Sequence, residues 1–162
     1  MEPQQDANAV SVLANRITIA TKVVAGDYSW GDTHIAIEKN GMFQSTKMKV
    51  NDDKNGTTSS GRINAEKLAG LSKVLSDHSL KDLPRKIGKI VHGQALVYRV
   101  EISLGDKKKN KPLVAYVIEN GEIVDANAKD ATAVNKVWAA VRETIASAKV
   151  SSIKKVKSLP KG

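Results

Sequence analysis

The sequence predicts an α+β protein of two layers, in which a mainly antiparallel sheet of five or six strands carries two helices on one face, in the order β-β-β-α-β-β-(β)-α. Several segments alternate apolar and polar residues, as half-buried strands do, and turn residues separate them. Two other segments repeat apolar residues at helical spacing. Each of these apolar stripes needs a surface to cover it, and the sheet can supply that surface.

The composition is typical of a single globular domain. The chain has 162 residues, of which 41% are apolar, and this is enough for a hydrophobic core. We expect a disordered leader at 1–10, one domain at 11–150 and a basic C-terminal tail at 151–162. No apolar run is long enough to span a bilayer and no signal peptide is visible, so we expect a soluble protein. A cytoplasmic protein fits, and so does a secreted or periplasmic protein expressed without its signal peptide.

Three strands are expected before the first helix. Residues 16–24 and 33–39 both alternate, and the glycine-containing segment 26–32 is predicted to be a loop between them. The Asn-Gly pair at 40–41 favours a type I′ turn, so the chain should return as a hairpin strand over 42–50.

The first helix is expected over residues 65–78, after a polar loop at 51–61. Asn64 is a suitable N-cap, and Pro84 prevents any long continuation of the helix. The apolar stripe of this helix consists of Leu68, Leu71, Val74 and Leu75.

The second half repeats the plan of hairpin and helix. Residues 94–104 alternate clearly, and 113–118 are apolar on both faces, which is typical of a strand inside a sheet. A second Asn-Gly pair at 120–121 predicts a turn into a short return strand at 123–124.

The second helix is expected from the N-cap Asp130 to about residue 148, with a surface tail after Lys149. Serines at 151–152 favour helix formation only weakly, and Pro160 stops it. Trp138 is central in the apolar stripe and is predicted to be buried against the sheet. The stripe consists of Val134, Val137, Trp138, Val141, Ile145 and Ala148.

The formal net charge of +9 raises the possibility of an anionic partner. The basic residues gather in a turn after the fourth strand and in the C-terminal tail, and they could bind nucleic acid or an anionic envelope polymer. Solvated loops and a frayed tail explain the same residues without a partner. The candidate polyanion-binding residues are Lys107, Lys108, Lys109, Lys111, Lys154, Lys155 and Lys157.

The segment 26–32 is the other candidate binding site. Tyr28 and Trp30 are set there among glycines and aspartates, and aromatic residues in loops are frequent anchors of recognition. We predict a ligand- or partner-binding role for these two residues together with Asp27 and Asp32. The alternative is that both aromatic rings fold back and cap the core.

Residues 51–62 resemble a calcium-binding loop but lack part of its ligand set. Asn51, Asp53, Asn55 and Gly56 have the alternating oxygen ligands and the glycine of such a loop, but Arg62 stands where the bidentate glutamate belongs. A polar connection explains the same residues.

The three histidines, His34, His78 and His92, have no metal-binding spacing, and the chain has no cysteine. We therefore predict no metal site and no cofactor. The sequence contains no nucleophile elbow, phosphate-binding loop or dinucleotide fingerprint, so the catalytic residues stay unassigned.

Three classes of function remain open. A non-catalytic binding or interaction domain is the first, a polyanion binder is the second, and a hydrolase-type enzyme whose site is not visible in the sequence is the third. The expected partner is another protein or an anionic polymer, and the sequence leaves the oligomeric state open.

Overall fold

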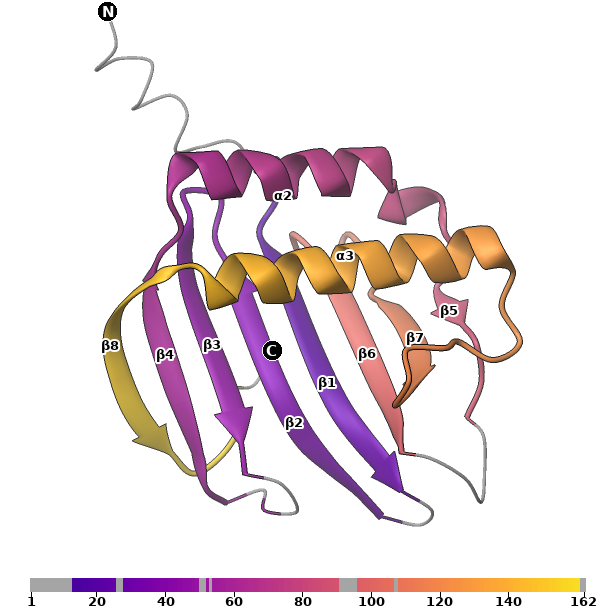
Figure 1. Cartoon of the computed structure of the whole chain (residues 1–162), viewed down its shortest axis with the longest axis horizontal. Coiled ribbons are helices and arrows are strands. Elements are labelled where there is room, and N and C mark those ends of the chain that lie inside the picture. The colour runs from indigo at the N-terminus through magenta and orange to yellow at the C-terminus, as the bar shows by residue number, and fades with distance from the viewer. Residues whose placement is uncertain are drawn as a thin grey trace, which may run out of the picture.

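The computed structural model describes residues 13–25, 28–49, 52, 54–90, 96–106 and 108–160. They form one eight-stranded sheet, and two α-helices lie side by side on one face of it (Figure 1). The elements in chain order are β1 (Ile17–Ala25), β2 (Tyr28–Ile37), β3 (Met42–Met48), β4 (Gly56–Arg62), α2 (Ala65–Asp77), the 3-10 helix η1 (Leu80–Asp82), β5 (Lys86–Ile87), β6 (Val97–Leu104), β7 (Leu113–Ile118), α3 (Ala128–Ala146) and β8 (Lys149–Val156).

The predicted α+β class with a mainly antiparallel sheet is confirmed. The strands lie in the order β5-β7-β6-β1-β2-β3-β4-β8, and β5–β7 is the one parallel pair among them. The predicted number of five or six strands is wrong, and so is the element order, since four strands precede α2 and one follows α3. None of the helices in the described ranges is long and apolar enough to cross a membrane.

Two of the additional strand segments have little apolar alternation. The predicted loop 51–61 contains all of β4 except Arg62, and the small polar residues of this strand pair on both sides through the backbone. The predicted loop 26–32 contains the first half of β2, which pairs with β1 as far as Tyr28 and Ala25. Backbone hydrogen bonds thus decide these two segments, and their side chains give only a weak signal.

The boundary at residue 151 falls inside strand β8, which pairs with β4 at the edge of the sheet (Figure 1). The lysines therefore belong to a strand over residues 149–156. The pairing is close, because a Cβ at Gly61 would lie 3.1 Å from Val150 Cα and would clash with the Lys149 carbonyl oxygen. After β8 the chain turns back, and Leu159 contacts Gly31 of β2.

The helix caps are partly as predicted. Asn64 is the N-cap of α2, and its Oδ1 accepts a hydrogen bond from Lys67 N at 2.8 Å. The cap of α3 is Asn127 rather than the predicted Asp130, because Asn127 Oδ1 accepts from Asp130 N at 2.8 Å. The carboxylate of Asp130 in turn accepts from Asn127 Nδ2 at 3.0 Å and lies in the first helical turn, where negative charge is favoured.

The two Asn-Gly turns form, with differences in detail. Gly41 has a φ of 92°, and no positive φ occurs at Asn40, so the first turn is not the predicted type I′. The second turn closes with Gly121 N donating to Ile118 O at 2.7 Å. The predicted return strand at 123–124 is a turn, and its Ile123 is buried beside Gly88.

The core lies between the helices and the sheet face that they cover. Strand alternation places Ile17, Ile19, Ile35 and Ile37 on that face, and the register aligns them in two rows across β1 and β2. The two apolar helix stripes close the core from the other side, as predicted. The fully buried helix residues are Leu68, Leu71, Val134, Val137 and Val141.

Candidate ligand-binding cleft

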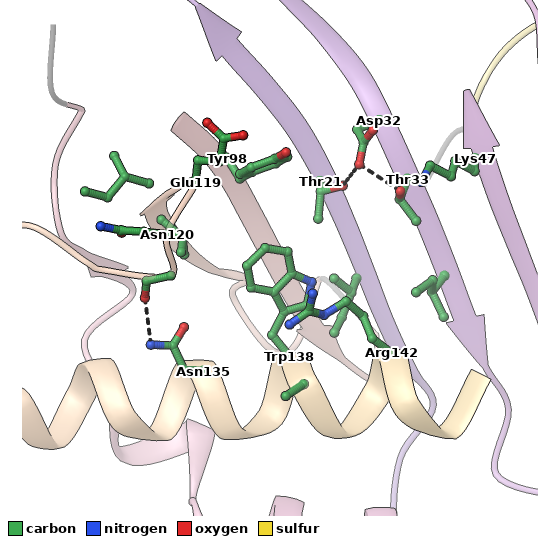
Figure 2. Close-up of a pocket in the computed structure, with 16 residues that line it drawn as sticks. Thr21, Asp32, Thr33, Lys47, Tyr98, Glu119, Asn120, Asn135, Trp138 and Arg142 are labelled. Atoms are coloured by element: carbon green, nitrogen blue, oxygen red, sulfur yellow. Dashed lines mark hydrogen bonds between the residues drawn. The ribbon is translucent and has the colours of Figure 1, made fainter. Parts of the chain in front are cut away.

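A cleft of about 590 Å³ lies between α3 and the helix-facing side of the sheet. It forms where β1 and β2 extend beyond α3, which crosses the upper part of the sheet in Figure 1. Five strands, the turn after β7 and α3 contribute to its walls. The polar and aromatic residues that line it are Thr21, Asp32, Thr33, Lys47, Tyr98, Glu119, Asn120, Asn135, Trp138 and Arg142 (Figure 2).

Trp138 and Arg142 form the helical wall of the cleft. They are four residues apart on α3 and therefore lie on the same face of the helix. The Arg142 guanidinium carbon is 4.4 Å from the centre of the Trp138 ring, a cation–π arrangement (Figure 2). Tyr98 of β6 meets the same indole at a centroid distance of 6.1 Å and an interplanar angle of 55°.

The prediction that Trp138 is buried needs correction, since the side chain is only half-buried. It lies at the margin of the apolar stripe, where it packs against the core on one side and borders the cleft on the other. The fully buried position in this part of the stripe belongs to Val137.

Asp32 occupies the opposite wall because of a β-bulge. The register passes from Thr21↔Thr33 to Lys22↔Gly31, so Asp32 has no partner residue on β1. Its Oδ2 accepts hydrogen bonds from Thr33 Oγ1 at 2.9 Å and from Thr21 Oγ1 at 3.2 Å (Figure 2). In the described ranges Oδ1 has no partner, so one acceptor is fixed in position at the cleft.

The third wall is the turn between β7 and α3. Asn120 Oδ1 accepts from Glu122 N at 3.0 Å, which leaves its amide nitrogen as a donor. Asn135 Nδ2 donates to Gly121 O at 3.1 Å, which leaves its side-chain oxygen as an acceptor (Figure 2). The turn is thus held to α3 by a hydrogen bond and offers both kinds of hydrogen-bonding group.

The charges of the cleft balance. Lys47 and Arg142 are its cations, and Asp32 and Glu119 are its carboxylates. A cleft lined in this way has no overall preference for a cation or an anion. It does present donors and acceptors on several walls at once.

Of the three predicted ligand-binding residues that the structure describes, Asp32 alone lines this cleft. Tyr28 lies at the end of β2 with 77% of its surface exposed, and Trp30 is half-buried in the same strand. Asp27 lies outside the described residues. Sequence reasoning missed the pair Trp138 and Arg142, although an aromatic and an arginine at i, i+4 on one helix were visible.

The predicted polyanion-binding lysines do not form one surface. Lys108, Lys109 and Lys111 lie in the β6–β7 turn, and Lys107 is outside the described residues. The C-terminal group lies on or just after β8, which is five strand spacings of about 4.8 Å, or about 24 Å, from β6. Within that group Lys154 and Lys155 point to opposite faces, because they are successive residues of a strand.

The described parts of the chain contain no group of three or more side chains suited to hold a metal ion. Asn51 and Asp53 of the incomplete calcium loop lie outside those parts. Asp52 is used within its own turn, where it accepts from Asn55 Nδ2 at 2.8 Å and from Lys54 N at 2.9 Å. These hydrogen bonds, the Asn55 contact above all, lower the pKa of the Asp52 carboxyl.

The histidines are dispersed. His34 is buried in β2 on the sheet face away from the cleft, and His78 is the C-cap of α2. His92 lies outside the described residues. The structure therefore brings neither described histidine to the cleft.

Comparison of the chain with protein-family models, with curated proteins and with solved structures found no match. The cleft beside α3 provides an aromatic wall, a fixed carboxylate and balanced charge.

Trp138→Ala is expected to lower the free energy of unfolding by about 2 kcal/mol, below the range for a fully buried tryptophan, because only part of the ring is removed from the core. Urea denaturation at constant m-value measures this loss. Val137→Ala, at a fully buried neighbouring position, provides the comparison. A loss above about 4 kcal/mol for Trp138→Ala would mean that the whole ring belongs to the core.

Proposed function

We propose that the protein is a non-catalytic binding protein that holds a small, neutral, polyhydroxylated ligand, such as a mono- or disaccharide, in the cleft beside α3. The observation that carries the proposal is the combination of an aromatic wall with donors and acceptors of balanced charge. A sugar ring has an apolar C–H face and a rim of hydroxyls, each of which donates and accepts.

The aromatic wall supports the apolar half of this recognition. Trp138 and Tyr98 are inclined to each other, so together they make an angled surface on which a ring can pack. Arg142 covers part of Trp138 and is itself exposed, so its side chain can move aside or extend the stacking surface. None of these three residues lies in a loop, since Trp138 and Arg142 are on α3 and Tyr98 is on β6.

The polar half is supported by groups whose positions are already fixed. Two threonine hydroxyls hold Asp32 through Oδ2, and its Oδ1 can accept from a ligand hydroxyl. The amide of Asn120, whose oxygen is held by Glu122 N, can donate to the same kind of ligand. The ammonium group of the exposed Lys47 is a further donor, although no hydrogen bond or ion pair within the described ranges fixes its position; Asp32 and Asn120 are the preorganised groups. Such preorganised groups lose little entropy when the ligand binds.

The size of the cleft agrees with a ligand of one or two sugar rings. Taking about 30 Å³ for each water-sized group, a volume of 590 Å³ corresponds to about 20 non-hydrogen atoms. The cleft is open on one side, so this number is an upper limit for the enclosed part of a ligand. The volume lies within the usual range of small-molecule sites.

Tryptophan fluorescence tests the proposal directly. The chain has two tryptophans, so Trp30→Phe leaves Trp138 as the sole reporter. Neutral sugars such as glucose, galactose, mannose, maltose and cellobiose are titrated into this variant, with glucuronate and glucosamine as charged comparisons. At least one neutral sugar is expected to produce a saturable change that the charged compounds do not.

Variants of the cleft provide the second part of the test. Asp32→Asn and Arg142→Gln are each expected to weaken binding of the active sugar by about tenfold, as expected for loss of one charged contact. Lys136→Gln is the matched control, because Lys136 is exposed on the same helix but does not line the cleft. The proposal fails if only charged compounds bind, or if both cleft variants bind as well as the control.

A further inference from the structure

A second cavity, of about 290 Å³, lies between η1 and the β6–β7 turn. Four cationic side chains line it, namely Lys81, Arg85, Lys109 and Lys111, and none of the described lining residues carries a carboxylate. This contrasts with the cleft beside α3, where cations and carboxylates balance. A concave site with cations alone attracts anions.

Arg85 holds the two sides of the cavity together. Its guanidinium donates to Leu80 O and Leu83 O, the latter at 2.8 Å, and to Lys111 O at 2.9 Å. It thereby joins the segment after α2 to the β6–β7 turn. Carbonyl oxygens satisfy these donors without cancelling the full positive charge, so Arg85 both shapes the cavity and keeps it electropositive.

The β6–β7 turn is also fixed from within. Asp106 O accepts from Lys109 N at 3.0 Å and from Asn110 N at 2.8 Å, and the Asp106 carboxylate accepts from Lys108 N at 2.9 Å. Asn110 Nδ2 donates to Leu104 O at 3.0 Å. The backbone of Lys109 is therefore fixed by its hydrogen bond to Asp106, and that of Lys111 by its hydrogen bond to Arg85, before any ligand arrives.

The ammonium groups themselves are available. In the described parts of the chain, Lys81, Lys109 and Lys111 form no ion pair, and all three are exposed. Charge-assisted hydrogen bonds to an anionic oxygen would satisfy them. The floor of the cavity is different, since Leu80, Ile102 and Leu113 offer it only apolar side chains.

We infer that this cavity binds a compact organic anion, namely a phosphate or carboxylate attached to a small apolar body. The cations account for the anionic group, and the apolar floor accounts for the body, which finds no hydrogen-bonding side chain there. At about 30 Å³ for each water-sized group, the volume of 290 Å³ admits about ten non-hydrogen atoms. This site is separate from the sugar-binding cleft, and neither proposal depends on the other.

The test uses phenyl phosphate as the probe, with inorganic phosphate and phenol as its two halves, and the full chain studied by calorimetry. Phenyl phosphate is expected to bind saturably, at least about tenfold more tightly than inorganic phosphate, since the ring buries apolar surface. Phenol should show no saturable binding. A second pair of probes, benzoate with its anionic group and benzyl alcohol without one, shows whether a carboxylate can replace the phosphate.

Two double variants with the same change of charge locate the site. Lys109→Gln with Lys111→Gln is expected to weaken phenyl phosphate by about tenfold or more, because two charged contacts are lost. Lys154→Gln with Lys155→Gln on β8 is the control and should bind as the unchanged protein does. All four lysines are exposed, so both variants should keep the melting temperature of the parent.

Three results would overturn the inference. The first is that phenyl phosphate does not bind, and the second is that it binds no more tightly than inorganic phosphate. The third is an equal loss in both double variants, accompanied by salt-dependent binding of a short single-stranded DNA that both variants weaken. That outcome would identify a diffuse polyanion surface in place of a cavity.

Discussion

Leu68→Ala is expected to lower the free energy of unfolding by about 3–4 kcal/mol, the largest effect of a single substitution anticipated for this protein. Leu68 has 0% of its surface exposed and is the first residue of the α2 stripe. It also packs beneath the β2–β3 turn, where its Cδ2 lies 3.4 Å from the position of a Cβ on Gly41. The alanine leaves a cavity that both the helix and the turn border, and urea denaturation measures the cost.

Leu75→Ala is the matched control, since the same atoms are removed from a half-buried position of the same helix. Its cost is expected to be about half that of Leu68→Ala, because less apolar surface returns to water. Equal losses at the two positions would mean that α2 is rotated relative to its packing in this structure.

Gly61→Ala is expected to lower the free energy of unfolding by about 2–3 kcal/mol, because the added methyl group collides with backbone on β8. The Lys149 carbonyl carbon is 3.0 Å from the position of that Cβ, and backbone cannot move aside as a flexible side chain can. The start of β8 must therefore shift or detach. Relative to the parent protein, Gly61→Ala should accelerate amide hydrogen exchange in β8 and on the β8-facing amides of β4 more than elsewhere in the sheet.

Gly70→Ala provides a control of opposite sign. Gly70 is exposed in α2 and has nothing within 4 Å of a Cβ, so alanine should stabilise the helix by about 0.5–1 kcal/mol. If Gly61→Ala were as harmless as Gly70→Ala, β8 would not be docked closely on β4.

The helices and the central strands could be predicted because their signals are local. The apolar residues of α2 recur at helical spacing, and Asn64 marks where the helix begins. The alternation in β1 and β6 is strong because one face of each strand is buried against the helices. Apolar periodicity and helix caps of this kind can be recognised within about ten or fifteen consecutive residues.

Strands β4 and β8 could not be found in the same way. The residues of β4 are mostly small and polar, and β8 carries lysines and serines together with Val150, Ile153 and Val156, which are exposed or only half-buried, so neither strand buries a continuous apolar face. Backbone hydrogen bonds join β4 to its neighbour β3 and to the distant strand β8, and β8 has no other partner among the described strands. Gly61 permits the close approach of β8. The local pattern of apolar and polar residues does not indicate which distant segment will pair with such a strand.

Only one residue that lines the candidate cleft, Asp32, was predicted from the sequence as a binding residue. Asp32 was selected because it neighbours aromatic residues, whereas the structure brings it to the cleft through a bulge opposite Thr21. Trp138 faces Asp32 only after β1, β2 and α3 have been assembled, and this depends on register. The spacing of Trp138 and Arg142 was a local signal, but it did not show which surface the pair would face.

The distance in sequence between β4 and β8 has a consequence for synthesis of the protein. Ser151 Oγ donates to Ser60 O across 91 residues, so the outer side of β4 stays unpaired while all of that chain is made. At about 5–20 residues per second, a ribosome needs about 5–20 s to supply the missing strand. During this interval the nascent chain exposes an edge rich in serine and threonine, with no charge between Gly56 and Gly61, to neighbouring chains on the same polysome. Slow elongation or a stall before residue 149 prolongs the exposure, and co-translational aggregation of this protein would begin there.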